Sequence, residues 1–158
     1  MSTDIIVGFP GETDDDFERT LEVAAAAEYD YAYMFIFSPR PGTEAAEMEA
    51  DYVDPLVARE RFQRLKIGID RSALAKHAAR VGRTEEVLIE GPSKRNPDVI
   101  SGRTRQNKLV HFAPPHPIRT GSYARVEVTR AAPHHLEGRF VELVAEPTHK
   151  IRIPVSTS

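Results

Sequence analysis

The pattern of apolar and polar residues changes near residue 80. Before that point the chain has uninterrupted apolar stretches, Ile5–Val7 and the longer YAYMFIF run at Tyr31–Phe37, each bounded by polar and turn residues. An uninterrupted run predicts a strand that is buried on both faces, as strands of parallel sheets are. After residue 80, apolar residues recur at every second position, which indicates strands with one buried face. The chain is therefore expected to contain two parts of different architecture.

Two helices are predicted in the first part. Thr13 precedes three consecutive acids, and a hydroxyl cap followed by carboxylates satisfies the free N–H groups and the positive dipole end of a helix. Asp54-Pro55 starts a second helix in the same way, because proline is favoured at the first helical position. Apolar residues at three- and four-residue steps extend this helix to about Arg80, and Gly82 is its expected stop. Strand, helix and strand in this order predict a right-handed parallel βαβ unit followed by a long helix.

Five short strands are predicted in the second part, separated by turns that contain Pro, Asn, Asp or Gly. They are Glu85–Glu90, Val99–Thr104, Lys108–Phe112, Tyr123–Ala131 and Leu136–Leu143. Five such strands with little helix are typical of a small closed barrel of the oligonucleotide-binding (OB) kind. The expected fold class is α+β in two parts, an α/β portion at residues 1–80 and a five-stranded antiparallel OB-like β-barrel at residues 81–145. Residues 146–158 are expected to form a tail.

Charge divides the chain at the same place. The formal net charge is −3, but residues 1–79 hold 8 Lys or Arg against 16 Asp or Glu, whereas residues 80–158 hold 13 against 8. A basic half joined to an acidic half points to a polyanionic partner for the basic one, and nucleic acid is the first such partner to consider.

Basic residues gather in the stretch Gly91–Phe112, where turn residues and β-forming residues coincide. The cations are Lys94, Arg95, Arg103, Arg105 and Lys108, and the single acid is Asp98. Five cations on a short ribbon attract a polyanion through the release of counterions. Arg103, Arg105 and Asn107 alternate, so on a strand they would project from one face, which the two cations of the preceding loop would extend. The alternative is a ribbon whose charges only keep the surface soluble.

Several classes of site are excluded by composition. The sequence contains no cysteine, which excludes disulfides, thiolate zinc sites and iron–sulfur ligation by this chain. The six histidines lack the spacing of metal ligands, and the neighbours His134-His135 indicate solvent exposure or RNA contact. No serine or histidine has the pattern of a nucleophile–base pair, so no catalytic residue is assigned. The apolar runs are shorter than the roughly 20 residues of a membrane span and no signal peptide opens the chain, so a cytoplasmic protein with no membrane partner is expected.

The first part offers weaker candidates. The loop Gly8–Gly11 follows a strand and is of the kind that cradles phosphates or nucleotides, although glycine and proline also close strand-to-helix turns for geometric reasons. Asp4 and Glu12 bracket that strand and are candidates for ribose hydroxyls or a base amine, or have structural roles only. Arg40 stands between two prolines, which would orient it for a carboxylate or phosphate or leave it as a surface residue of a rigid turn.

Three stretches resemble the C-terminal part of the radical SAM methylthiotransferases that modify tRNA. They are TDIIVGFPGET, YMFIFSPRPGTEAAEM and EGPSKRNPDVISGRTRQNKLVHF, and the resemblance continues to about Leu143. SPRPGT and the block from SKRNPD to GRTRQNKLVHF favour the tRNA-modifying branch over the sister enzymes that methylthiolate an aspartate of a ribosomal protein.

The resemblance implies a composite enzyme. These proteins have an N-terminal methylthiotransferase domain, a radical SAM partial barrel of α/β type and a C-terminal TRAM domain, a β-barrel that binds tRNA. Residues 1–80 would be the end of the radical SAM barrel and residues 81–145 a complete TRAM domain. The enzymes use S-adenosylmethionine and two 4Fe-4S clusters held by cysteines, which this sequence lacks.

The same resemblance implies two sets of site residues. Those expected near S-adenosylmethionine are Asp4, Gly8, Glu12, Ser38 and Arg40. Those expected to face RNA are Lys94, Arg95, Arg103, Arg105, Asn107 and Lys108.

The whole enzyme is expected to add a methylthio group to the prenylated adenosine next to the anticodon. This chain looks like a fragment of it, either a shortened piece or the product of a split gene, and is expected to be inactive alone. The alternatives are a stand-alone RNA-binding module and a non-functional remnant. The expected partners are tRNA and either the missing N-terminal part of the enzyme or a second copy that covers the truncated barrel.

Overall fold

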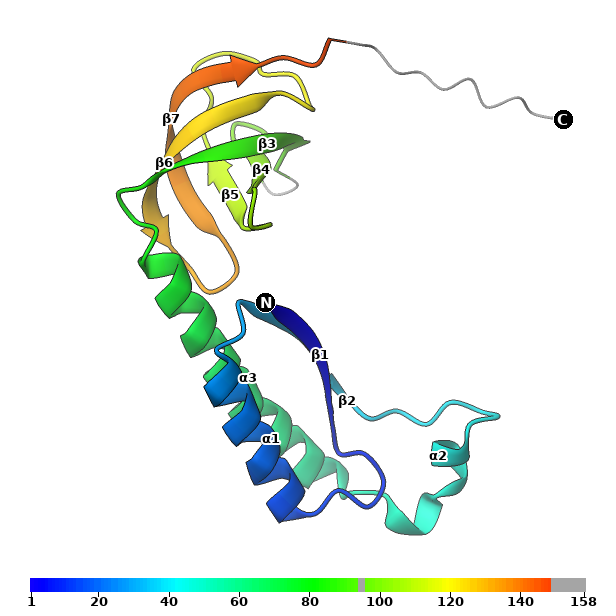
Figure 1. Ribbon diagram of the computed structural model, residues 1–158. Coiled ribbons are helices and arrows are strands. Elements are labelled where there is room, and N and C mark those ends of the chain that lie inside the picture. The colour runs from blue at the N-terminus through cyan, green and yellow to red at the C-terminus, as the bar shows by residue number, and fades with distance from the viewer. Residues whose placement is uncertain (94–95, 149–158) are drawn as a thin grey trace, which may run out of the picture. The chain divides into compact units, whose positions relative to one another are not determined.

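The computed structural model describes residues 1–93 and 96–148. The chain divides into two compact units, Met1–Lys76 and His77–Ser158, and the division falls near the end of the longest helix (Figure 1). Along the described part of the chain, no helix combines the length and the apolar composition that crossing a membrane requires.

The first unit contains the expected βαβ arrangement. Strand β1 (Ser2–Val7) is followed by helix α1 (Asp14–Ala27) and strand β2 (Tyr31–Ile36), and the two strands pair in parallel from Ser2↔Tyr31 to Val7↔Ile36. Thr13 caps α1 as predicted, because its Oγ1 accepts a hydrogen bond of 3.2 Å from the Asp16 N–H while the Asp16 carboxylate accepts one of 3.0 Å from the Thr13 N–H. The hydrogen bonds from Thr13 lower the pKa of Asp16.

The remainder of this unit is helical. Helix α2 (Glu44–Glu47) and a 3₁₀ turn (Glu49–Asp51) lead into helix α3 (Pro55–Ala78). Asp54 caps α3 as predicted, since its Oδ1 accepts a hydrogen bond of 2.7 Å from the Leu56 N–H. The helix ends two residues before the predicted Arg80, and Gly82 adopts a positive φ of 82°. Helix α2 and the 3₁₀ turn were not predicted, because single turns are too short to show a period.

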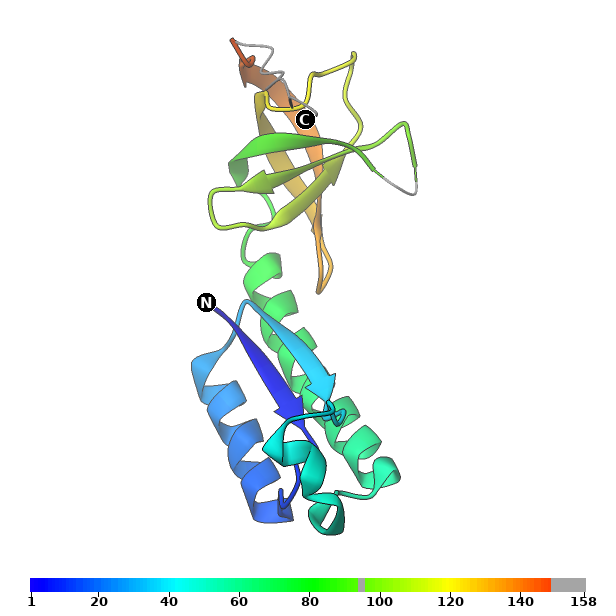
Figure 2. The ribbon, with the colours of Figure 1, turned by 90° about the vertical axis from the view of Figure 1, so that its right-hand side faces the viewer.

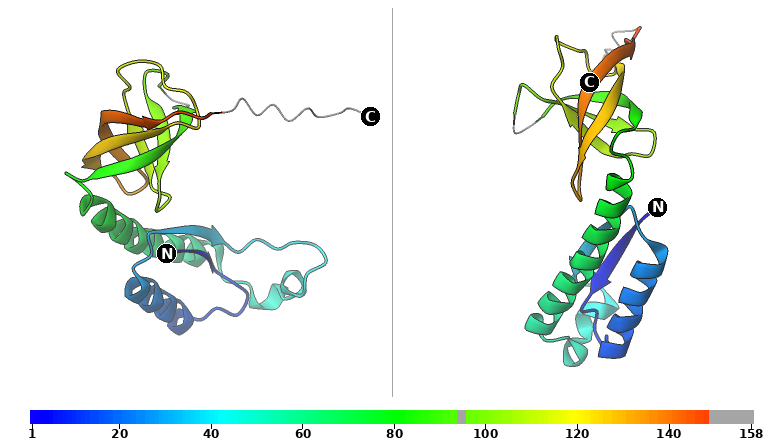
Figure 3. Two further views of the ribbon diagram at one scale, coloured as in Figure 1. Left: turned by 45° about the horizontal axis from the view of Figure 1, so that its top comes forward. Right: turned by 90° about the vertical axis from the view of Figure 1, so that its left-hand side faces the viewer.

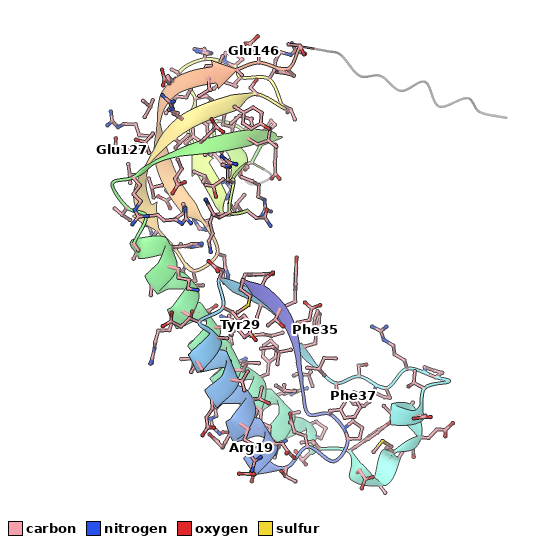
Figure 4. The ribbon with its side chains drawn as sticks, viewed as in Figure 1. Arg19, Tyr29, Phe35, Phe37, Glu127 and Glu146 are labelled. Carbon is pink, nitrogen blue, oxygen red and sulfur yellow. The ribbon has the colours of Figure 1, made fainter. Side chains whose placement is uncertain are left out.

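Helices α1 and α3 cover one face of the pair of strands β1 and β2, as Figures 1 and 2 show. Val7 and Ala32 from the strands pack with Phe17 and Ala24 from α1 and with Leu65 and Ile69 from α3. The prediction that Tyr31–Phe37 is buried on both faces is wrong. Tyr31, Tyr33 and Phe35 alternate with the buried face and are exposed, and Figure 4 shows Phe35 on the side of the strands away from α1. Only two strands and no barrel are present here, so nothing in this unit covers that face.

The second unit is a closed barrel of five strands (Figure 3). They are β3 (Thr84–Pro92), β4 (Ile100–Thr104), β5 (Leu109–Phe112), β6 (Tyr123–Ala131) and β7 (Leu136–Ala145), arranged in the order β3-β4-β5-β7-β6. Inward-facing apolar residues fill the interior, namely Val87, Ile89, Ile100, Val110, Phe112, Ala124, Val126, Val128 and Leu136. The strand positions confirm the prediction to within one or two residues at each end.

The prediction of a wholly antiparallel barrel is wrong. Strands β5 and β7 pair in parallel, through Val110↔Leu136 and His111↔Glu137, and the other four pairings are antiparallel. The reason is topological. Strand directions cannot alternate all the way round a closed ring of five, so one neighbouring pair has to be parallel. The barrel is therefore mixed.

Candidate nucleic-acid interface

The outer surface of β4 and β5 carries polar and basic side chains. Burial alternates along both strands, so Ser101 and Arg103 of β4 and Leu109 and His111 of β5 face outward. The register places Ser101 opposite His111 and Arg103 opposite Leu109. In barrels of the OB kind, the face formed by the second and third strands binds oligonucleotides, and β4 and β5 occupy those positions here.

A turn after β4 changes the predicted arrangement of the basic residues on one face of a strand. Arg103, Arg105 and Asn107 do not alternate along one strand, because β4 ends at Thr104 and the next four residues form a hairpin turn. Hydrogen bonds close it, from Asn107 N to Thr104 O at 2.9 Å and from Thr104 N to Lys108 O at 3.0 Å. Asn107 has a φ of 60°, a left-handed conformation that asparagine tolerates better than most residues. Arg105 and Asn107 are therefore exposed at the tip of the hairpin rather than on the strand face.

The cations of this region differ in availability. Arg103 Nε lies 3.3 Å from Glu90 Oε1, and its Nη1 donates to the Asn107 carbonyl at 3.2 Å. Arg105 is exposed and makes no ion pair within residues 1–93 and 96–148. Lys108 is only 5% exposed, so it does not share this surface. Lys94 and Arg95, the other two cations predicted to face RNA, lie outside the described residues.

Strands β6 and β7 present cations that are already paired. Arg125 contacts Glu142 at 2.5 Å, Arg130 contacts Glu137 at 3.1 Å, and Arg139 pairs with Glu127. Each pair joins directly opposite residues of the two strands. Cross-strand pairs of this kind stabilise the sheet by about 0.2–1 kcal/mol each and leave little net positive charge. The hairpin that follows β4 is thus the better candidate for contact with a polyanion.

Reasoning from the sequence missed His111, which lies on this surface beside His135, a residue for which it predicted solvent exposure or RNA contact. The His111 Nδ1 lies 3.0 Å from Ser101 Oγ, and the His111 ring meets the His135 ring edge-on with centroids 5.2 Å apart. Their positions, 24 residues apart in the sequence, become neighbours only because β5 and β7 are paired. Strand alternation was the one available signal, since it places His111 on the outer face.

In the first unit, Glu12 is engaged in holding its own loop. Its Oε2 accepts hydrogen bonds from the Gly8 N–H at 2.8 Å and from Arg61 Nη1 at 2.6 Å, and Arg61 Nη2 donates to Asp14 Oδ1 at 2.7 Å. Burial acts to lower the pKa of Arg61, but the hydrogen bonds to Asp14 and Glu12 raise it overall. Gly8 has a φ of 71°, and an added Cβ would lie 2.8 Å from the Ala58 Cβ. The loop is therefore clamped onto α3, and the structure gives Glu12 a structural role.

The other residues predicted near S-adenosylmethionine are not assembled into one pocket. Asp4 lines a cavity of about 350 Å³ between β1 and α1, together with residues such as Asp16 and Arg19, and none of the other four candidates lines it. Ser38 and Arg40 are exposed in the loop that follows β2. The parallel pairing does bring Gly8 and the segment before Ser38 to the same edge of the strand pair, since Val7 is opposite Ile36.

Comparison with known proteins identifies the barrel. Residues 78–141 match the family described as TRAM domain. Over 142 residues, 90% of its length, the chain is 48% identical to a protein of Moorella thermoacetica named tRNA-2-methylthio-N(6)-dimethylallyladenosine synthase. The chain is a relative of these synthases. Proteins of the same name from Aeromonas hydrophila and Geobacillus thermodenitrificans are 40% identical over the whole chain and 47% identical over 92% of it.

The similarity covers the chain but not the synthases. The chain spans 32%, 32% and 28% of the lengths of these three relatives. All the residues predicted to face RNA fall inside the TRAM match, and all five predicted near S-adenosylmethionine fall before it. The candidate interface on β4, β5 and their hairpin is therefore a surface of the TRAM domain.

Iron–sulfur clusters do not fit the residues of this chain. Such clusters are held by cysteine thiolates, and the sequence contains no cysteine. Among residues 1–93 and 96–148, no group of three or more His, Asp or Glu is placed to hold a metal ion. Any cluster that serves the relatives' reaction would need ligands from other polypeptide.

Proposed function

We propose that the TRAM domain of this chain binds tRNA through the outer face of β4 and β5 and the hairpin between them. It acts as the RNA-holding part of a methylthiotransferase that adds a methylthio group to the prenylated adenosine next to the anticodon. The observation that carries the proposal is the contrast between Arg105, exposed and without an ion pair in the described chain, and the paired arginines of β6 and β7. The name and the similarity of the synthases support the choice of tRNA.

The chemical step is assigned to polypeptide outside this chain. The resemblance implies radical chemistry that begins with reductive cleavage of S-adenosylmethionine at a 4Fe-4S cluster, and the cofactor supplies that reactivity. Asp4, Gly8, Ser38 and Arg40 remain candidates for the cofactor's rim, whereas Glu12 acts through the loop that it holds. The exposed face of β1 and β2 is where the rest of a partial barrel, or a second copy, would pack.

Replacement of Arg105 by alanine tests the RNA interface. Because the side chain is proposed to neutralise a phosphate, Arg105→Ala should weaken binding of a tRNA anticodon stem-loop by about three- to tenfold at low salt and lower the slope of log K against log salt by about 0.7–0.9. Fluorescence anisotropy over a salt series measures both quantities. Arg103→Ala should act in the same direction.

Arg139→Ala is the matched control, because it changes the net charge by the same amount at a paired position. The affinity of the Arg139→Ala variant for the stem-loop should stay within about twofold of that of the unmodified chain. Equal losses in Arg105→Ala and Arg139→Ala would show that only overall charge matters and would reject this interface.

Purified chain should not cleave S-adenosylmethionine, even after iron–sulfur reconstitution, because it has no cysteine to hold a cluster. Chromatographic detection of 5′-deoxyadenosine checks this, with the Moorella thermoacetica synthase as the positive control in the same assay. Product above the level of a protein-free reaction would contradict the assignment of chemistry to other polypeptide.

A further inference from the structure

A row of polar side chains crosses four strands on the outer face of the barrel. The register places Ser101 of β4 opposite His111 of β5, His111 beside Glu137 of β7, and Glu137 opposite Arg130 of β6. His135 lies one residue before β7 and packs its ring against His111. The row adjoins the candidate RNA interface, because Arg103 follows Ser101 by two residues on the same face of β4.

The contacts within this row leave one nitrogen available. Ser101 Oγ holds His111 Nδ1 at 3.0 Å, which fixes the ring. The second ring nitrogen, Nε2, has no hydrogen-bond partner in the part of the chain that the structure describes, and it is not among the buried atoms that lack one. His111 therefore presents Nε2 to solvent from a ring that is already oriented.

The carboxylate that favours a protonated His111, Glu137, is shared with other cationic groups. Glu137 Oε1 lies 3.1 Å from Arg130 Nη1 and 3.7 Å from His135 Nε2, so this carboxylate already serves two partners. Arg103 on β4 is paired with Glu90, and His134 is the other titratable group of the turn before β7. Partial burial and the neighbouring His135 lower the pKa of His111, and Glu137 acts in the opposite direction. Without a bound anion, His111 therefore favours its neutral form. An anion bound nearby would shift the protonation equilibrium toward the charged form.

We infer that His111 and His135 form a phosphate-binding subsite of the RNA interface, at which an RNA phosphodiester binds the protonated histidine pair. The inference rests on the proposed function, because RNA has to reach this face of the TRAM domain. A phosphate near the rings favours their charged forms, so binding takes up a proton. The affinity for RNA should accordingly rise as the pH falls below the ordinary histidine pKa of 6.5.

The test is the pH dependence of RNA affinity, measured with the full chain and a fluorescein-labelled tRNA anticodon stem-loop at constant salt. For each proton taken up, binding should tighten by up to about tenfold per pH unit between pH ~7 and pH ~5.5. The double variant His111→Gln with His135→Gln should lose most of this dependence. His116→Gln is the matched control, because His116 packs edge-on to Phe140 outside the row, and it should keep the dependence.

The outcomes separate this inference from the proposed function. Binding at pH ~7.5 that does not change on acidification overturns the subsite and leaves the TRAM interface standing. Absence of binding at every pH overturns both. Circular dichroism at each pH reports folding, which matters because a histidine with a lowered folded pKa destabilises the fold as the pH drops through 6.5.

A second measurement covers the case in which the double variant fails to fold. NMR titration of the His111 ring in the unmodified chain should give a higher pKa with RNA bound than without it, and an unchanged pKa would overturn the inference.

Discussion

Gly102→Ala is expected to lower the free energy of unfolding of the barrel by about 3 kcal/mol or more, or to prevent the barrel from folding. Gly102 is an inward-facing residue of β4, opposite Ile89 of β3. A Cβ at this position would lie 2.5 Å from the Leu88 carbonyl oxygen and closer still to the Val87 side chain. The carbonyl belongs to the backbone, so it cannot rotate away as a side chain can. Two strands of a narrow barrel approach this closely only where a side chain is missing.

Denaturant unfolding followed by circular dichroism measures this loss, and amide exchange assigns it to the barrel. Gly68→Ala is the control, because Gly68 lies in α3 and a Cβ there would meet no atom within 4 Å apart from its chain neighbours and the backbone of its own helix. Alanine is favoured over glycine inside a helix by about 0.5–1 kcal/mol, so this variant should be slightly more stable than the unmodified chain. A barrel that unfolds at the same denaturant concentration with alanine at 102 would contradict the steric argument.

Local signals in the sequence predicted most of the elements. Thr13 and Asp54 marked the starts of α1 and α3 because a capping oxygen acts within three residues of itself, and the structure shows both caps. The five barrel strands were visible as alternating apolar positions, because one face of each strand packs on the interior. The prediction that Tyr31–Phe37 is buried on both faces was wrong, although it was also based on the local pattern of apolar residues. An uninterrupted apolar run does not distinguish a strand covered on two faces from one whose second face carries exposed aromatic rings.

What sequence reasoning missed depends on contacts between distant residues. The parallel pairing of β5 with β7 follows from closing a barrel with an odd number of strands. The sequence of any one strand does not show how many strands the barrel contains or which strand it pairs with. The same pairing also brings His111 and His135 together. The turn at Asn107 keeps Arg103, Arg105 and Asn107 from sharing one strand face. An asparagine before a lysine is a weak turn signal, so the sequence did not predict this turn. The partner of Glu12 is Arg61, 49 residues later, and no spacing rule connects the two.

Arg61→Leu is expected to lower the free energy of unfolding of the first unit by about 3 kcal/mol, because it leaves the Glu12 carboxylate buried without its cation. The Arg61 and Glu12 side chains are only 5% and 10% exposed, and the guanidinium binds both the carboxylate and the backbone carbonyl of Glu12. Denaturant unfolding measures the loss. Combining Arg61→Leu with Glu12→Gln should recover part of it, because the amide oxygen can still accept the hydrogen bond from Gly8 without carrying a buried charge.

Arg64→Leu separates the buried ion pair from the packing of a guanidinium on an aromatic ring. Both arginines lie over the ring of Phe17, at 5.6 Å for Arg61 and 5.1 Å for Arg64, so both variants lose that contact. Arg64, however, pairs with Glu18 at a site where the two side chains are 43% and 52% exposed, and an exposed pair contributes less than about 1 kcal/mol. Equal losses in the two variants would assign the stability to the ring contact. A loss confined to Arg61→Leu would show that the clamp on the Gly8–Glu12 loop depends on the buried charge pair.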